Sequence, residues 1–243
     1  MPAAPVDLLA PFPGLSPDAL TFLRQLKRNN DREWFRPRKE TYDEELLEPM
    51  RMLVSDLSRR LPDAGLPLSG DPKRAVFRIY RDTRFSKNKA PYKTHLAAVL
   101  SRDGHKRAPG ALYLHIEPGA HRIAGGFWRA DKDFIRGWRD RLSADPQEFL
   151  DLVTDLEAAG LTMSTSGSTL TRMPRGYDAQ RDNPAVDYFQ WKGGFAASRE
   201  DLTDEDVQSP AFADQVVETA RALGPLLDYG WRIVDETSVP AAA

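Results

Sequence analysis

The sequence predicts an α+β fold: a central, mainly antiparallel sheet flanked by N-terminal and C-terminal helices. Three observations support this. Helical periodicity dominates both ends of the chain, strand patterns are concentrated between residues 75 and 128, and those strands follow one another without helices between them. Repeats and low-complexity linkers are absent, so we expect one domain over residues 12–236, between a flexible arm (1–11) and a flexible tail (237–243).

The first helix has an unambiguous start in the sequence. Ser16 suits the N-cap position and Pro17 the first helical position, because proline lacks the N–H that a first turn leaves unused. The helix should end near Lys27, before the pair Asn29-Asn30, and Asp31 should cap a short turn after it.

A second helical pattern follows Pro37. Apolar residues recur there at steps of three and four, which predicts one amphipathic helix, kinked at Pro49 and ended by Pro62. The residues on its apolar face are Tyr42, Leu46, Met50, Leu53, Leu57 and Leu61.

The middle of the chain has the alternation of strands. We expect strands at 75–80 and 95–100, separated by a long loop from Asp82 to Lys93, and then a hairpin of 111–117 and 122–128. With Gly119-Ala120 as its turn, Glu117 should face Arg122. One face of the hairpin should be buried (Leu112, Leu114, Ile116, Ile123 and Phe127), and the other is polar and aromatic (Tyr113, His115, Glu117, Arg122 and Trp128).

The last third of the chain returns to helices. Asp131 should begin a helix to Leu142, and Asp145-Pro146 should begin another to about Ala159. The remaining expected elements are two short strands within 161–170, a turn-rich loop at 174–183, a short helix at 186–192, a strand at 195–197, a helix from Ser209 to Leu223 and a segment at 225–233 that packs behind it.

Composition narrows the function classes. The chain has no cysteine, which excludes disulfides and cysteine metal sites and fits a cytoplasmic location. It has no apolar run near the ~18 residues of a membrane span and no secretory signal. A net charge of −2 argues against non-specific coating of nucleic acid but permits a local basic cleft. The sequence identifies no cofactor and no oligomeric state, and it lacks Walker and dinucleotide-binding motifs.

The segment from Arg78 to Tyr92 is the best candidate for a functional site. Arginine and lysine are frequent in it, Asp82 is its only acid, and aromatic residues lie between the cations. Guanidinium groups cannot lose their proton, so this segment should contact something anionic.

The same segment resembles the signature of a bacterial and fungal family known only as a domain of unknown function. The signature reads Arg-x-x-Arg-Asp-x-Arg-Phe-x-x-x-Asn-Lys-x-x-Tyr in this chain. The resemblance extends over residues 12–235 and implies no activity, cofactor or catalytic residue. Its other motifs are Phe12-Pro13-Gly14-Leu15, Asn29-Asn30-Asp31-Arg32-Glu33-Trp34-Phe35 and Pro174-Arg175-Gly176-Tyr177.

Three interpretations of the basic segment remain open. The first is a pocket for a small phosphate- or carboxylate-bearing ligand. The second is a nucleic-acid groove in which Tyr80, Phe85 and Tyr92 stack on bases. The third is a structural network of ion pairs with Asp82, Glu117 or Asp31, which would make the protein an interaction module. The candidate ligand-binding residues are Arg78, Arg81, Asp82, Arg84, Lys89 and Tyr92, joined from a distant loop by Arg175 and Tyr177.

The hairpin supplies the candidate catalytic residues. His115 could act as a general acid or base beside Glu117, and we expect the pair to lie within reach of the basic segment. We predict no tightly bound metal, because His121 falls in the turn and no third ligand has a clear spacing; bound metal would instead make His115, Glu117 and His121 its ligands. His95 and His105 look like residues of loops or strand edges. The pair Gly125-Gly126 could admit a ligand or allow a tryptophan to pack.

Overall fold

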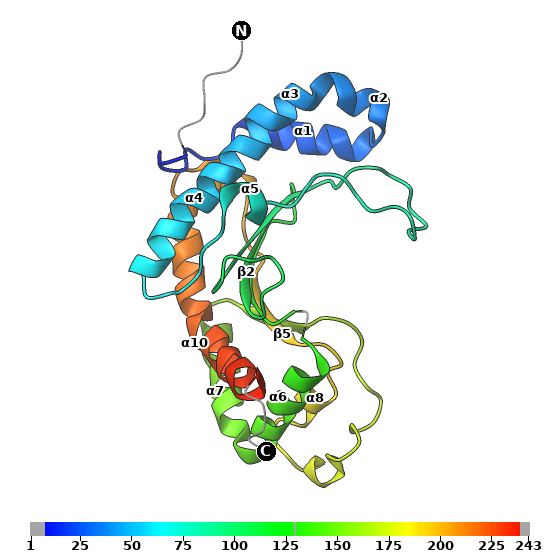
Figure 1. Cartoon of the computed structure of the whole chain (residues 1–243), viewed down its shortest axis with the longest axis vertical. Coiled ribbons are helices and arrows are strands. Elements are labelled where there is room, and N and C mark those ends of the chain that lie inside the picture. Colours follow the sequence, from blue (N-terminus) through cyan, green and yellow to red (C-terminus); the bar gives the residue numbers. More distant parts are fainter. Residues whose placement is uncertain (1–7, 129, 239–243) are drawn as a thin grey trace. The chain divides into compact units, whose positions relative to one another are not determined.

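The computed structural model describes residues 8–128 and 130–238, and confirms the α+β class (Figure 1). These residues group into two compact units. The first comprises the described part of Met1–Ala108 with Leu112–Ile123 and Glu200–Thr219, and the second comprises Pro109–Ala111 with the described parts of Ala124–Arg199 and Ala220–Ala243. A single domain stays a prediction. The predicted arm and tail fall largely on residues 1–7 and 239–243, which lie outside the described residues.

Five strands form one antiparallel sheet in the order β1-β2-β3-β5-β4. They are β1 (Leu96–Ser101), β2 (Ala111–Ile116), β3 (Arg122–Gly126), β4 (Thr162–Thr165) and β5 (Phe195–Arg199). The register of the last pair places Thr162 opposite Ser198 and Thr165 opposite Phe195.

In the first unit, the N-terminal helix forms as predicted. Helix α1 (Pro17–Arg28) begins after Ser16, whose hydroxyl accepts a hydrogen bond of 3.1 Å from the Ala19 N–H. Its buried face includes Phe22, which contacts the rings of Phe35 and Tyr42. The helix therefore packs its apolar face on the helical segment that follows it.

That segment is a nearly continuous helical run. It consists of α2 (Arg32–Phe35), η1 (Arg36–Arg38), α3 (Lys39–Tyr42), η2 (Asp43–Leu47) and α4 (Glu48–Asp63). The disturbance expected at Pro49 takes the form of a π-helical turn, η2, immediately before it, because proline cannot donate to the carbonyl four residues earlier.

The prediction that Pro62 ends this helix is wrong. Pro62 lies inside the last turn of α4, which ends at Asp63, and the chain turns away at Gly65, whose φ of 81° lies in the left-handed region. The Leu66 N–H then donates to the Leu61 carbonyl at 2.9 Å, which is the hydrogen bond of a Schellman cap.

The prediction of a strand at 75–80 is also wrong. Asp71 caps a short helix, α5 (Pro72–Ala75), and the residues after it pair with neighbours only through isolated bridges, Val76 with Ala98 and Tyr80 with Tyr92. An aspartate before a proline is a helix-start signal, and it outweighs the alternation that follows.

The hairpin has the predicted division of its faces. Leu112, Leu114 and Ile116 are fully buried, whereas Tyr113 and His115 are half-buried on the other face. The predicted Glu117–Arg122 pair is not formed. Glu117 instead bonds to Lys27 at 3.1 Å, and Arg122 pairs with Glu200 at 2.9 Å.

In the second unit, helices α6 (Lys132–Ala144) and α7 (Pro146–Ala158) begin after their predicted caps, Asp131 and Asp145. A 3₁₀ turn, η3 (Asp178–Gln180), and α8 (Val186–Phe189) follow along the chain. The expected second strand within 161–170 is reduced to one bridge, between Thr169 and Trp191.

Gly126 is a position where both the backbone angle and the space around it require glycine. Its φ is +148°, and a Cβ there would lie 2.4 Å from the Phe195 carbonyl oxygen and 2.5 Å from Ala196 Cα. The glycine thus permits close approach of strand β5, and a ligand contact at Gly125-Gly126 stays a prediction.

Two elements near the C-terminus differ from expectation. Helix α9 (Asp204–Gln208) was not predicted; Thr203 and Asp206 form its capping box. Helix α10 (Phe212–Ser238) continues through Pro225, where a separate segment was expected. Leu223, Leu226 and Leu227 are fully buried around that proline, so packing holds the helix together despite a missing backbone hydrogen bond.

Candidate functional site

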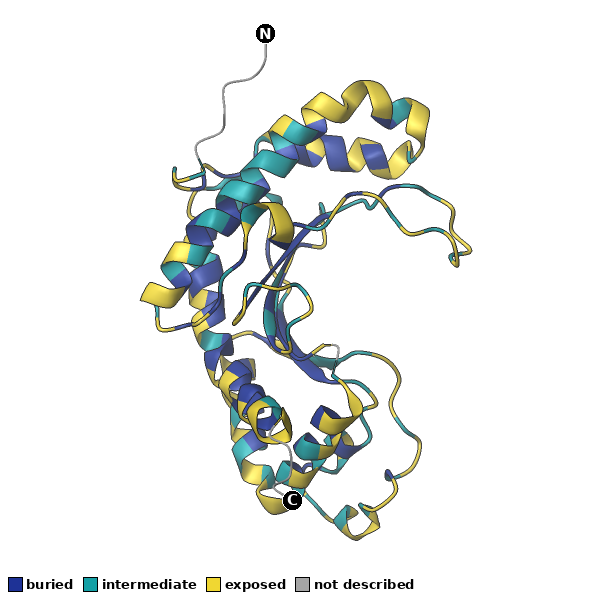
Figure 2. Ribbon diagram, in the orientation of Figure 1, coloured by how far each residue is buried: buried dark blue, intermediate teal, exposed yellow. Residues whose placement is uncertain are grey.

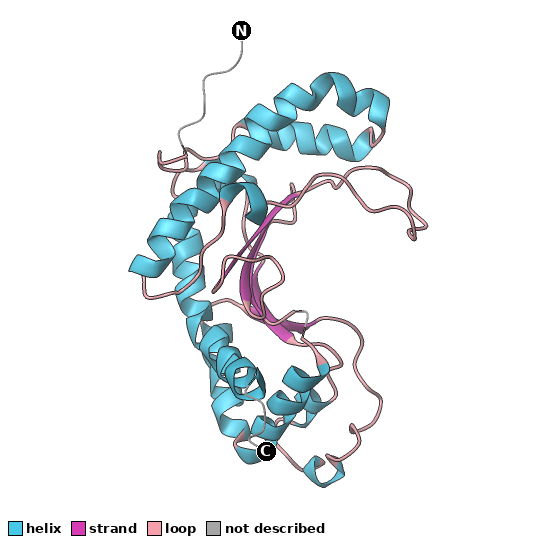
Figure 3. Ribbon diagram, viewed as in Figure 1, coloured by secondary structure: helices cyan, strands magenta, loops and turns pink. Residues whose placement is uncertain are grey.

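The basic segment contains a long loop, residues 82–90, which we call the excursion. Backbone hydrogen bonds hold its two ends together, and these paired ends are its base. The Arg81 N–H donates to the Pro91 carbonyl at 2.8 Å, and the Lys93 N–H donates to the Ile79 carbonyl at 2.7 Å. Residues 82–90 leave and return between these bonds without helix or strand (Figure 3). The backbone hydrogen bonds at the base give Arg81 a defined position. Most residues of the tip are exposed to solvent (Figure 2).

The base of this excursion is attached to the N-terminal helices. The ring of buried Tyr92 stacks on Phe35, with 4.2 Å between centroids and 26° between planes, and Tyr80 lies 5.5 Å from Tyr92. The Asn30 side chain holds the Tyr92 main chain at both ends: its amide donates to the Tyr92 carbonyl and its oxygen accepts from the Tyr92 N–H, each at 3.0 Å.

A pocket of about 460 Å³ lies over this aromatic contact. Its lining combines rings with cations and contains no acidic residue. The lining residues are Arg32, Phe35, Arg36, Lys39, Tyr80, Arg81, Thr83, Pro91 and Tyr92. Two of the segments that carry the family resemblance in this unit, 29–35 and 78–92, therefore contribute side chains to one cavity.

The cations of the pocket are largely unpaired. Within the described residues, Arg32, Arg36 and Arg81 form no ion pair, while Lys39 pairs with Asp43, a hydrogen bond that raises the lysine's pKa. Burial raises the pKa of the Tyr92 hydroxyl, so it stays protonated and able to donate. The pocket thus offers fixed positive charge and hydroxyl donors to a bound anion.

The structure brings together only part of the predicted ligand-binding set. Arg81 and Tyr92 line the pocket, and Arg78, Asp82, Arg84 and Lys89 are not among its lining residues. The Arg84 side chain forms two hydrogen bonds with the Asp82 carboxylate, at 3.0 and 2.7 Å, and holds the pKa of that carboxyl at about 2. This exposed pair is one that the structural interpretation anticipated. Lys89 donates to the Thr83 carbonyl at 2.9 Å.

Three cations of the pocket were missed by sequence reasoning. Arg32, Arg36 and Lys39 follow one another at steps of four and three residues. That spacing places side chains on one face of a helical run. The helical spacing of the three cations was therefore the signal in the sequence that could have found them.

A cluster of titratable groups surrounds the predicted catalytic pair. His115 Nε2 lies 3.4 Å from Glu117 Oε2, and its Nδ1 lies 2.9 Å from the Tyr113 hydroxyl. His95 adds a ring whose centroid is 4.2 Å from that of His115. Burial lowers the pKa of both imidazoles, that of His95 to about 4, so both are neutral near pH 7. A catalytic role for His115 and Glu117 stays a prediction.

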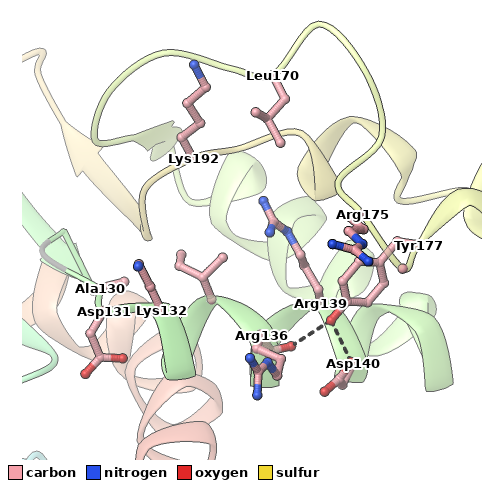
Figure 4. A pocket seen from close by; sticks show the side chains of 12 residues that line it. Ala130, Asp131, Lys132, Arg136, Arg139, Asp140, Leu170, Arg175, Tyr177 and Lys192 are labelled. Carbon is pink, nitrogen blue, oxygen red and sulfur yellow. Dashed lines mark hydrogen bonds between the residues drawn. The ribbon is translucent and has the colours of Figure 1, made fainter.

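Arg175 and Tyr177 line a different pocket, of about 610 Å³, formed within the second unit (Figure 4). The Tyr177 hydroxyl donates to Asp140 at 2.7 Å, and burial with this hydrogen bond raises its pKa to about 12. Arg139 donates to the carbonyls of Phe189 and Trp191 at 3.0 and 2.9 Å. Tyr177 and Arg139, two polar side chains that line this pocket, therefore already hydrogen-bond to other parts of the protein.

The fold and the first pocket define an α+β protein with a basic, aromatic cavity. The chain belongs to the DUF2461 family of conserved hypothetical proteins, whose model matches residues 18–229. The resemblance inferred from the motifs is thereby confirmed as a family assignment. Comparisons with curated proteins and with solved structures give no match. Among the described residues, none of the helices combines the length and apolar character that crossing a membrane requires.

Proposed function

We propose that the protein binds a small ligand bearing a phosphate or carboxylate group in the pocket over Phe35, Tyr80 and Tyr92. The observation that carries this proposal is the meeting of Arg32, Arg36 and Arg81 around one cavity whose lining has no carboxylate. Like charges brought together by folding repel one another, and a bound anion removes that repulsion.

The aromatic side of the pocket supports a ligand with a flat group. Tyr80 is 57% exposed and lines the pocket, so part of its ring is accessible to a flat group of a ligand. The planar guanidinium fork can donate two parallel hydrogen bonds to two oxygens of one anion, which favours carboxylate and phosphate over halide.

The test is ligand-induced thermal stabilisation with inorganic phosphate and with a library of phosphorylated and carboxylated metabolites. A ligand that binds only the folded state raises the melting temperature as its concentration passes the dissociation constant. Arg81→Met and Arg36→Met should weaken the best ligand about tenfold or more, since each removes a charge-assisted hydrogen bond. Arg84→Met is the matched control, because Arg84 belongs to the same segment but does not line the pocket.

Absence of any stabilising ligand, or equal weakening by Arg81→Met and Arg84→Met, would contradict the proposal. Sulfate must be compared at equal ionic strength, because it also strengthens apolar burial in general.

One observation supports a second candidate function, binding of single-stranded nucleic acid. Phe85 is 95% exposed at the tip of the excursion, with the Arg84 guanidinium 5.8 Å from its ring and exposed Lys87 and Lys89 nearby. Exposed rings between cations are what base stacking requires.

Fluorescence anisotropy with short DNA and RNA separates the two functions. Nucleic-acid binding should weaken with salt at a log–log slope near −0.7 per contact on single strands, and Phe85→Ala should abolish it. Anion binding in the pocket should be unchanged by Phe85→Ala. If oligonucleotides fail to bind at low salt, the second function is excluded.

A further inference from the structure

We propose that His95, His115 and Glu117 form a binding site for one divalent first-row transition-metal ion. The site goes beyond the proposed anion pocket, since none of these three residues lines that pocket. It also differs from the prediction of no tightly bound metal, which was made because the sequence spacing showed no third ligand.

The three potential ligand atoms already lie together. One nitrogen of each histidine and one oxygen of Glu117 are all within 4.8 Å of one another. His115 and Glu117 are two residues apart at the end of β2, so they extend from one face of the sheet, and His95 directly precedes β1. Sheet pairing thus brings His95 to the position that its sequence spacing did not reveal.

The surroundings of Glu117 prepare one oxygen for a ligand. Its Oε1 accepts hydrogen bonds of 3.1 Å from Lys27 and 3.1 Å from Thr94, which fix the carboxylate plane. Its other oxygen, Oε2, faces His115 Nε2 at 3.4 Å. Metal-binding carboxylates are commonly held in this way by neighbours that do not touch the metal.

The surroundings of His115 are of the same kind. Its Nδ1 lies 2.9 Å from the Tyr113 hydroxyl. Without a metal, the tautomer with its proton on Nε2 can donate to Glu117 Oε2 and accept from the Tyr113 hydroxyl. With a metal bound, the proton would instead be on Nδ1 and donate to Tyr113, and the Nε2 lone pair would bind the ion beside Glu117 Oε2. Tyr113 is a positioning residue in this arrangement.

His95 and His121 differ in what their rings already bind. Within the described residues, neither ring nitrogen of half-buried His95 forms a hydrogen bond or ion pair, so both lone-pair and N–H capacity remain for a ligand. His121 is buried and bonds Asp204 through Nε2 at 2.8 Å. The third ligand is therefore His95, where the sequence had suggested His121.

The ligand set indicates the class of metal. Two imidazoles and a carboxylate suit zinc, iron, cobalt or manganese better than calcium or magnesium, which prefer all-oxygen sites. Bonds of about 2.0–2.1 Å around a tetrahedral ion require ligand atoms roughly 3.4 Å apart, so side-chain rotations must draw the three groups closer. Three protein ligands leave a coordination position for water or substrate.

The experiment is calorimetric titration of chelator-treated protein with Zn²⁺ and, separately, Co²⁺. We expect one ion per chain and a change in the visible Co²⁺ spectrum on binding. His95→Ala, His115→Ala and Glu117→Gln should each weaken binding by more than tenfold, and Tyr113→Phe by about 10–100-fold through loss of the positioning hydrogen bond. His105→Ala is the control, because His105 is exposed and lies outside the cluster.

The proposal is overturned if the parent binds neither ion, or if His105→Ala weakens binding as much as His95→Ala does. Circular dichroism of each variant verifies that it folds, and Glu117→Gln keeps the size of the side chain if an alanine variant does not. Arg81→Met should bind Zn²⁺ like the parent, so failure of the anion pocket and failure of the metal site give different results.

Discussion

The Asn30 side chain forms two hydrogen bonds with the main chain of Tyr92, 62 residues away in the sequence. It pairs as a neighbouring strand would, and so fixes the end of the basic segment to the start of α2. The motif at 29–35 and the signature at 78–92 are thus two halves of one local structure.

Asn30→Ala should lower the free energy of unfolding by about 1–3 kcal/mol, because it leaves a partly buried N–H and carbonyl of Tyr92 without partners. Urea denaturation measures the change. Asn88→Ala, in the exposed part of the excursion, is the control and should stay within about 0.5 kcal/mol. Equal effects of the two substitutions would show that the Asn30 bonds contribute nothing specific.

Arg81→Met should leave the free energy of unfolding unchanged or raise it slightly in the absence of ligand. The arginine has no carboxylate partner among the described residues and is repelled by Arg32 and Arg36 across the pocket. Guanidinium denaturation is unsuitable because the denaturant is itself a cation, so urea is used. A loss of about 3 kcal/mol or more would mean that Arg81 belongs to a buried ion pair instead.

Tyr177 should make stability depend on alkaline pH. Its folded pKa, about 12, lies above the value of about 10 in the unfolded chain, so the folded state holds the proton longer. Its contribution is present below about pH 10 and is lost as the pH rises toward 12. The difference in unfolding free energy between the parent and Tyr177→Phe should therefore shrink over that range. A difference that is independent of pH would rule out the Tyr177–Asp140 hydrogen bond as its cause.

Gly126→Ala should destabilise the protein by at least about 3 kcal/mol, the upper end of what overpacking costs. The added Cβ would meet backbone atoms of β5, which cannot move aside as a side chain can. Gly160→Ala is the matched control: its φ is +75°, but nothing lies within 4 Å of the added carbon, so about 1–2 kcal/mol is expected. Thermal or urea unfolding that ranks Gly160→Ala as the worse variant contradicts this explanation.

Local signals in the sequence predicted much of the fold. Ser16-Pro17, Asp131 and Asp145-Pro146 mark helix starts through bonds within a few residues, and all three caps form. The errors arose where distant packing decides. Helix α10 continues through Pro225 because buried leucines surround it, and no local rule carries that information.

The candidate site was predicted less completely for the same reason. Arg81 and Tyr92 lie at the paired base of a single segment, so the pattern of that segment alone indicated both residues. Arg36 and His95 reach their clusters only through tertiary contacts, across the aromatic stack at Phe35 and through pairing of the sheet. A single sequence shows which residue types are available but not which segments meet.

Because the base of the excursion at 82–90 is closed by hydrogen bonds, the geometry of the pocket does not depend on how long the excursion is. Lengthening a loop whose ends are already held together costs only the slow logarithmic increase of closure entropy, and the bonds of Arg81 and Lys93 do not pass through the tip. Insertions near Ser86 should therefore be tolerated, and the tip is a suitable place for an affinity tag or a fluorescent reporter.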